Sequence, residues 1–231
     1  MTPPLVLLPG MMCDGRLFSP QIKALSDERE VVVGDLAGAA DMGGLAEAVL
    51  SNAPQRFALA GLSMGGIVAM EIVARAPDRV ERLALLDTNP RAELPEVKAR
   101  RAPQIAAVRA GGLERVMREE LKPNYLADGP HRAEILEVCM AMALDLGPEV
   151  FARQSLALRD RPDRQDALRA VRVPTLILCG ALDALCPVER HELMHALVPG
   201  SRLVVVEGAG HMPTLERPEE TTAALARWLA D

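Results

Sequence analysis

The chain has 231 residues, enough for one full-sized hydrophobic core, so the sequence predicts a single domain over residues 1–231. Hydrophobic residues make up 49% of the chain and charged residues 25%, as in ordinary globular proteins, and the net charge of −6 argues against a nucleic-acid partner. Because the first apolar run is too short for a signal peptide or a membrane span, we expect a cytoplasmic protein that inserts into no membrane.

Short apolar runs alternate with amphipathic segments along most of the chain. The expected strands are Leu5–Leu8, Glu30–Val33, Phe57–Ala60, Leu83–Leu86, Thr175–Cys179 and Leu203–Val206. Helical spacing marks the segments Phe18–Leu25, Leu45–Leu50, Gly66–Arg75, Val188–Leu197 and Thr221–Leu229. Continuous apolar runs suit strands that are buried on both faces, as in parallel sheets. The sequence therefore predicts an α/β fold with a mostly parallel sheet of about six or more strands flanked by helices.

The alternation is interrupted once, between about residues 90 and 170. This stretch is rich in Ala, Leu, Met and Arg, has helical spacing and contains no convincing strand. Turn-forming residues break it at Gly111-Gly112, Lys122-Pro123-Asn124, Asp128-Gly129-Pro130 and Gly147-Pro148. We expect four or so helices that form an inserted cap over one end of the sheet, where a lid would sit. Scaffold helices without a gating role are the alternative.

The segment Gly61-Leu62-Ser63-Met64-Gly65 joins an expected strand to an expected helix. A serine between glycines at such a junction is the layout of a nucleophile elbow, in which a sharp turn exposes the serine hydroxyl at the start of a helix. Small neighbours let the strand and the helix pass close together, and the free N–H groups of the helix favour a developing negative charge. We therefore expect Ser63 to be the nucleophile of a hydrolase.

A serine hydroxyl needs a base to remove its proton, and the base needs an acid to orient it. His211 follows the last expected strand, and Asp183 follows the strand before it. Because the carboxyl ends of parallel strands meet at one edge of the sheet, we expect these two residues and Ser63 to converge there. Asp87 also ends an expected strand and is the alternative acid. The loop context and the chain order Ser, Asp, His favour Asp183.

Four segments carry a resemblance to the α/β-hydrolase superfamily: Leu7–Met11, Gly61–Gly66, Gly180–Asp183 and Gly210–His211. The resemblance covers nearly the whole chain and implies an α/β-hydrolase fold with a helical cap. It also implies an oxyanion hole that uses the backbone N–H groups of Met11 and Met64. Pro9-Gly10 stands where many members of the superfamily have His-Gly, a departure that keeps the donor at Met11.

The resemblance implies a serine hydrolase, similar to carboxylesterases, that cleaves a small carboxylic ester through an acyl-enzyme. Such a mechanism uses no cofactor and no metal, and the expected partner is a small-molecule ester. The same triad serves enol-lactone hydrolysis, C–C bond hydrolysis and perhydrolase or haloperoxidase chemistry, which remain alternatives. A ligand receptor of the same fold that does not turn over is a further alternative.

The remaining titratable and apolar side chains carry weaker expectations. The cysteines at 13, 139, 179 and 186 include no CxxC pair, so we expect reduced thiols in or near the core. We expect structural roles for His131, His191 and His195. Side chains of the cap that could face the site are Met117, Leu121, Tyr125, Met140, Met142 and Leu144. The arginines expected at the surface, any of which could instead pair with a substrate carboxylate, are Arg109, Arg118, Arg153 and Arg159.

Overall fold

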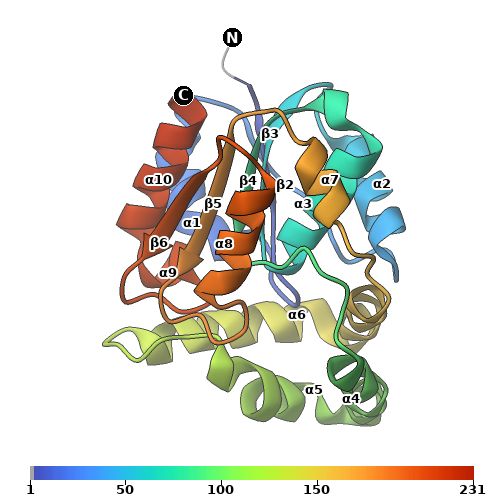
Figure 1. The fold of residues 1–231 in the computed structure, drawn as a ribbon. Helices are drawn as coiled ribbons and strands as arrows, with labels where there is room; N and C mark the ends of the chain where they lie inside the picture. The colour runs from blue at the N-terminus through green and yellow to red at the C-terminus, as the bar shows by residue number, and fades with distance from the viewer. Residues whose placement is uncertain (1–2) are drawn as a thin grey trace.

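The computed structural model describes residues 3–231 and shows one six-stranded sheet in which every neighbouring pair of strands is parallel (Figure 1). The strands follow the order β2-β1-β3-β4-β5-β6 across the sheet. Their bounds are β1 Leu5–Leu8, β2 Val31–Val33, β3 Phe57–Leu62, β4 Val80–Leu86, β5 Thr175–Gly180 and β6 Arg202–Val206. The predicted α/β fold with a parallel sheet of six strands is therefore confirmed.

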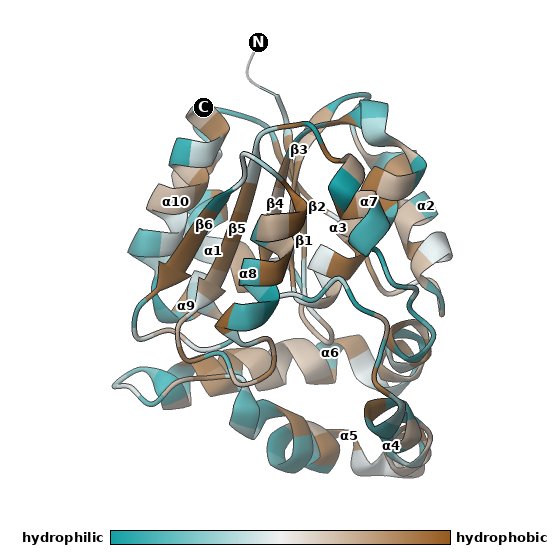
Figure 2. Ribbon diagram, in the orientation of Figure 1, coloured by the Kyte–Doolittle hydropathy of each residue, from teal (hydrophilic) through white to brown (hydrophobic). Residues whose placement is uncertain are grey.

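Helices cover both faces of the sheet (Figure 1). One face packs against α1 (Ser19–Leu25) and α10 (Pro218–Ala230), with the short α9 (Pro213–Glu216) beside them. The helices of the other face are α2 (Met42–Asn52), α3 (Met64–Arg75), α7 (Gln165–Ala170) and α8 (Val188–Leu197). Alternate residues of β1 enter the two resulting cores, because successive side chains of a strand point to opposite faces. Figure 2 shows the apolar strands between helices whose outer surfaces are hydrophilic.

A layer of helices lies across the carboxyl ends of the strands (Figure 1). We call residues 95–159 the helical layer. Its main helices are α4 (Pro95–Ala107) and α6 (Arg132–Arg159), which pack on each other. Between them lie short turns of helix: η3 (Val108–Gly112), α5 (Leu113–Arg115), η4 (Val116–Leu121) and η5 (Lys122–Asn124).

Two glycines with positive φ break these helices. Gly111 has φ 93° within η3, and Gly147 has φ 80° within α6, where the next residue is Pro148. Only glycine adopts such angles without strain, so each break occurs at a residue suited to it. The short turns η1 (Gly15–Phe18) and η2 (Pro77–Arg79) complete the elements. Within residues 3–231, no helix combines the length and the apolar character that crossing a membrane requires.

Candidate active site

The backbone at Ser63 has the strained geometry of a nucleophile elbow. Ser63 connects β3 to α3 with φ 54° and ψ −114°, angles that a non-glycine residue seldom adopts. A Cβ atom at Gly61 would collide with the carbonyl oxygen of Gly65, and a Cβ at Gly65 would collide with that of Leu8. The sharp turn therefore requires both glycines, because strand and helix nearly touch.

Hydrogen bonds from the neighbouring strand hold this turn. The N–H of Ser63 donates to the carbonyl oxygen of Leu86 at 2.9 Å, which extends the pairing of β3 and β4 by one residue. The hydroxyl of Thr88 donates to the carbonyl oxygen of Ser63 at 2.7 Å. Both backbone groups of Ser63 are therefore engaged, which holds the turn, and the side chain lines the main pocket at the start of α3.

His211 and Asp183 form a buried hydrogen-bonded pair beside Ser63. The Nδ1 atom of His211 lies 2.8 Å from Oδ2 of Asp183, and both side chains are at most 2% exposed. The other carboxylate oxygen accepts the N–H groups of Leu185 at 2.8 Å and of Cys186 at 2.9 Å. Burial disfavours the charged carboxylate, but His211 and these N–H groups outweigh burial and hold the pKa of Asp183 below its ordinary value.

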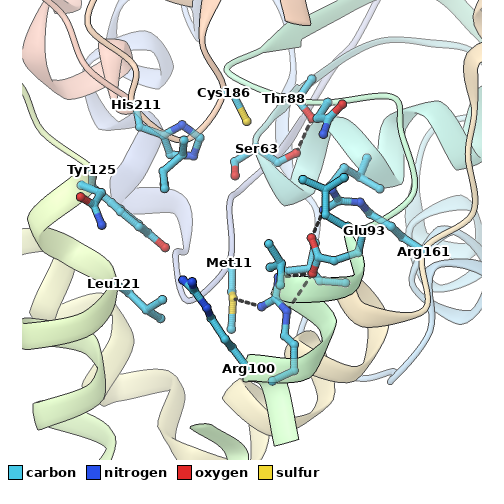
Figure 3. A pocket seen from close by; sticks show the side chains of 18 of the residues that line it. Met11, Ser63, Thr88, Glu93, Arg100, Leu121, Tyr125, Arg161, Cys186 and His211 are labelled. Atoms are coloured by element: carbon cyan, nitrogen blue, oxygen red, sulfur yellow. Dashed lines mark hydrogen bonds and ion pairs between the residues drawn. The ribbon is translucent and has the colours of Figure 1, made fainter. Parts of the chain in front are cut away.

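An ionised Asp183 fixes the tautomer of His211. A carboxylate only accepts hydrogen bonds, so Nδ1 of His211 carries a proton and Nε2 is left with a free lone pair. Figure 3 shows Ser63 and His211 facing one hollow, with Met11 and Tyr125 at its sides. The arrangement suits removal of a proton from a hydroxyl by Nε2.

Asp87, the alternative acid, lies at the end of β4 with a different environment. Its Oδ1 accepts the N–H of Gly180 at 2.9 Å, and its Oδ2 has no hydrogen-bond partner among residues 3–231. Burial, together with the nearby charge of Asp183, raises the pKa of Asp87 well above its ordinary value. The environment of Asp87 thus favours its protonated form, and the residue bonded to His211 is Asp183.

The loop after β1 approaches the elbow and is held by a buried glutamine. Oε1 of Gln154, on α6, accepts the N–H of Met12 at 2.8 Å, and Nε2 of Gln154 donates to the carbonyl oxygen of Leu36 at 2.9 Å. Met12 itself has φ 55°. The hydrogen bonds of residues 3–231 do not use the N–H groups of Met11 or Met64. Their role as oxyanion donors stays a prediction.

The sequence interpretation missed Gln154. A glutamine on an amphipathic helix is normally a solvent-facing residue, and no local pattern distinguishes this one. Its role depends on the way in which α6 crosses the sheet.

Glu216 ties the His211 loop to the helical layer and was also missed. Its Oε2 accepts the N–H groups of Gly210 and Met212, each at 3.0 Å, and its Oε1 accepts the N–H of Ala127 at 2.7 Å. In addition, the N–H of His211 donates to the carbonyl oxygen of Tyr125 at 2.8 Å. The five-residue interval between His211 and Glu216 is a signal in the sequence, although it conveys no role by itself.

His191 supports the end of β4 from α8. Its Nε2 accepts the N–H of Thr88 at 3.1 Å and its Nδ1 lies 3.3 Å from the carbonyl oxygen of Pro187. Residues His191 to His195 also match the H-E-x-x-H pattern of zinc-binding helices, which the sequence interpretation overlooked. Because both ring nitrogens of His191 are engaged and Nδ1 of His195 lies 2.7 Å from Ser201 Oγ, this pair is structural.

One group of potential metal ligands occurs among residues 3–231. The ligand atoms of Asp183, Cys186 and His211 lie within 4.8 Å of one another. Asp183 and His211 already satisfy each other, and burial raises the pKa of Cys186 above its ordinary value, which disfavours the thiolate that a metal needs. These residues fit a hydrogen-bonded pair better than a metal site. All four cysteines are free and buried.

The main pocket opens between the sheet and the helical layer. Of the side chains expected to face it, Leu121 and Tyr125 line it. Met117, Met140 and Met142 are instead buried in the apolar cores. The side chain of Leu144 is exposed. The four arginines expected at the surface do not line the pocket. Arg109, Arg118 and Arg159 form ion pairs with nearby carboxylates. Arg153 donates a hydrogen bond to the backbone carbonyl of Ala37.

Comparisons with known proteins agree with this fold. Residues 5–225 match the family described as the Alpha/beta hydrolase family. A pimeloyl-[acyl-carrier protein] methyl ester esterase of Aliivibrio salmonicida is 26% identical over 97% of this chain and 91% of its own length. An enzyme of the same name from Neisseria meningitidis serogroup B is 31% identical over 82% of this chain and 72% of its own.

Solved structures lead to the same family. A thermophilic esterase from Thermogutta terrifontis is 34% identical with a TM-score of 0.90, covering 98% of this chain and 89% of its own. An enol-lactonase from Burkholderia xenovorans, 24% identical with a TM-score of 0.86 over 100% and 91% of the two chains, shares the fold. The relatives named as esterases share one class of reaction, the hydrolysis of a carboxylic ester. This chain belongs to the alpha/beta hydrolase family.

Proposed function

We propose that this enzyme hydrolyses a small carboxylic ester through an acyl-enzyme formed on Ser63. The observation that carries the proposal is the 2.8 Å hydrogen bond between His211 and Asp183, buried beside the pocket that Ser63 lines. The esterase names of the relatives support the reaction class. The ester is a small molecule, and we expect the enzyme to act in the cytoplasm.

Ser63 attacks the ester carbonyl while Nε2 of His211 takes the hydroxyl proton. The N–H groups of Met11 and Met64 stabilise the oxyanion, at about 3 kcal/mol for each donor in the transition state. His211 then protonates the departing alcohol, and a water molecule activated by the same nitrogen releases the acid. Asp183 holds His211 in the required tautomer and stabilises its cationic form. The steps use only side chains and backbone groups of this chain.

The proposal includes a role for the helical insertion. We expect residues 90–170 to act as a cap within a single domain spanning residues 1–231. The packing of α4 and α6 across the carboxyl ends of the strands supports this role. Leu121 and Tyr125 supply pocket wall from this segment. A cap of this kind excludes water from the acyl-enzyme and selects among esters.

Substitution of the nucleophile tests the proposal. We expect Ser63→Ala to lower kcat for short p-nitrophenyl esters by at least about 10³-fold, because the acyl-enzyme cannot form. Ser51→Ala, at an exposed serine of α2, is the matched control and should keep full activity. A fluorophosphonate should label Ser63 alone, as judged by peptide mass spectrometry. Normal turnover by the Ser63 variant, or labelling of another serine, would refute the mechanism. A protein that is acylated once and then stalls would be a receptor.

A further inference from the structure

The main pocket is positively charged although the chain as a whole is acidic. Four arginines and two glutamates line it, a formal charge of +2 with His211 neutral, whereas the chain carries −6. The lining residues concerned are Arg100, Arg101, Arg161, Arg190, Glu93 and Glu120. A cleft of one sign in a protein of the other sign concentrates ligands of opposite charge. The binding preference of the pocket therefore depends on which of these charges lack a partner within the protein.

Two of the arginines are committed to one buried glutamate. Nε of Arg101 donates to Oε2 of Glu93 at 2.8 Å, and Nη1 of Arg161 lies 3.0 Å from Oε1 of Glu93 (Figure 3). The Glu93 side chain is 5% exposed, and those of the two arginines are 11% and 9% exposed. This trio carries one net positive charge in the pocket wall. Its members cannot be removed singly without leaving a buried charge unpaired.

The second glutamate is also paired, with a partner outside the pocket lining. Oε1 of Glu120 lies 2.9 Å from Nη1 of Arg115, and Oε2 accepts from Nε2 of Gln104 at 3.2 Å. Glu120 therefore offers no free negative charge to the other pocket arginines.

The other two arginines that line the pocket are Arg100 and Arg190. Among residues 3–231, neither forms an ion pair or donates a hydrogen bond to a carboxylate, and Arg190 has only a 3.9 Å contact from Nη1 to Sγ of Cys186. Figure 3 shows the guanidinium group of Arg100 extending into the hollow between Tyr125 and Met11. Arg100 is exposed, and an accessible guanidinium group that lines the pocket without a protein partner suits bidentate binding of a carboxylate.

Resting on the proposed function, we propose that the substrate is an ester with a second, free carboxylate, which Arg100 binds. The substrate class is the monoester of a dicarboxylic acid. Hydrolysis adds one water, releases the alcohol and leaves a dicarboxylate. Arg190 adds a longer-range attraction, and the Arg101–Glu93–Arg161 trio provides the positive wall. Because the product carries one more negative charge than the substrate, the same pocket retains it, and the dicarboxylate inhibits competitively.

Matched esters test the assignment. Monomethyl adipate and methyl hexanoate differ chiefly in the terminal carboxylate. We expect kcat/KM for monomethyl adipate to exceed that for methyl hexanoate by about tenfold or more. The difference should arise mainly from a lower KM, because a charge-assisted hydrogen bond strengthens substrate binding. The preference should shrink in 0.5 M salt because solvent-accessible charges are screened. A second pair, 6-acetoxyhexanoate and hexyl acetate, carries the carboxylate on the alcohol part instead and should show a smaller preference.

Variants assign the effect to Arg100. Arg100→Gln should abolish the preference for monomethyl adipate, so that the ratio of its kcat/KM to that of methyl hexanoate falls to about one, since a charge-assisted bond is lost only with the charged ester. Arg100→Glu should reverse the preference, so that methyl 6-aminohexanoate becomes the better substrate. Arg109→Gln, at an exposed ion pair with Glu149, is the matched control and should change neither value. Arg190→Gln should have a smaller effect than Arg100→Gln.

The outcomes separate this inference from the proposed function. Equal kcat/KM for charged and neutral esters in the parent enzyme, or a preference that survives in Arg100→Gln, overturns the dicarboxylate assignment while leaving Ser63 chemistry intact. A stronger preference for 6-acetoxyhexanoate over its neutral partner would move the anion to the alcohol part and likewise overturn it. If no ester is turned over and Ser63 takes up no probe, the proposed function fails and this inference fails with it.

Discussion

Two buried carboxyl groups at neighbouring strand ends have pKa values shifted in opposite directions. Asp183 accepts hydrogen bonds from two backbone N–H groups and from His211, and these interactions lower its pKa. Asp87 accepts only one, from Gly180, and its pKa is raised. Burial and the nearby charge of Asp183 raise the pKa of Asp87, whereas at Asp183 the hydrogen bonds and the attraction of His211 outweigh burial.

Asparagine substitutions distinguish the two carboxyl groups. We expect Asp183→Asn to lower kcat by about 10³–10⁴-fold, because an amide favours the wrong tautomer of His211. Asp87→Asn should lower kcat by less than about tenfold, since the amide resembles a neutral carboxylic acid in shape and charge. Steady-state kinetics on one p-nitrophenyl ester measures both. Equal losses in the two variants would mean that the acid role is shared.

At the residue scale the sequence predicted the residues whose roles depend on local motifs. Ser63, His211 and Asp183 each follow an apolar run and lie in short recognisable segments, and the structure brings them to one edge of the sheet. Their catalytic roles remain predictions that the variants test. Gln154 and Glu216 could not be assigned because their hydrogen bonds join segments that only the tertiary structure brings together.

The elements follow the predicted alternation, with differences at their ends. β4 begins at Val80, three residues before the expected Leu83, because Glu81 and Arg82 interrupt the apolar pattern inside a genuine strand. The arginine is tolerated there because Nη1 donates to the carbonyl oxygen of Trp228 at 3.1 Å. Within the helical layer, two of the four predicted breaks contain the positive-φ residues Gly111 and Gly147. Backbone constraints on glycine were therefore readable from the sequence, whereas the side-chain contacts of the strand ends were not.

Glu216 is a positioning residue that joins two elements, and its amide variant tests this role. We expect Glu216→Gln to lower kcat by about tenfold or more and to destabilise the fold by about 2 kcal/mol, because one amide cannot accept all three N–H groups. The profile of kcat against pH should also change, because a loosened loop changes the position and surroundings of the His211 imidazole. A purely structural role would change stability alone.

Glu220→Gln is the control for this variant. Glu220 is an exposed glutamate in the first turn of α10, and its replacement removes the same charge four residues away. We expect kcat and its pH profile to stay at the parent values. Chemical denaturation and steady-state kinetics on both variants provide the comparison.

For the whole molecule, His191 makes stability depend on pH. Burial lowers the pKa of His191 from 6.5 to about 4, so the folded protein keeps it neutral where the unfolded chain binds a proton. Its stabilising contribution is complete above pH 6.5 and is lost as the pH falls from there to about 4. The loss amounts to about 3 kcal/mol. Protonation at Nε2 would break the hydrogen bond from Thr88 that supports the end of β4.

Urea denaturation at pH 7 and pH 4.5 measures this dependence. We expect the free energy of unfolding of His191→Gln to fall less between these two values than that of the parent, because the titrating group is absent. His131→Gln replaces a histidine whose side chain is 73% exposed, and its free energy of unfolding should fall between the two pH values by as much as that of the parent. If the free energy of unfolding of His191→Gln falls by as much as that of the parent, groups other than His191 cause the loss of stability in acid.

The contacts of Glu216 and Tyr125 with the His211 loop constrain how the helical layer can be exchanged between relatives. Exchanging the entire segment between α4 and α6 with that of a relative would replace the pocket-lining residues of this segment. It would also replace the carbonyl of Tyr125 and the N–H of Ala127, which bind the His211 loop and Glu216. Chimeras with junctions on either side of residues 122–127, which retain the native segment, should stay active while their ester preference changes.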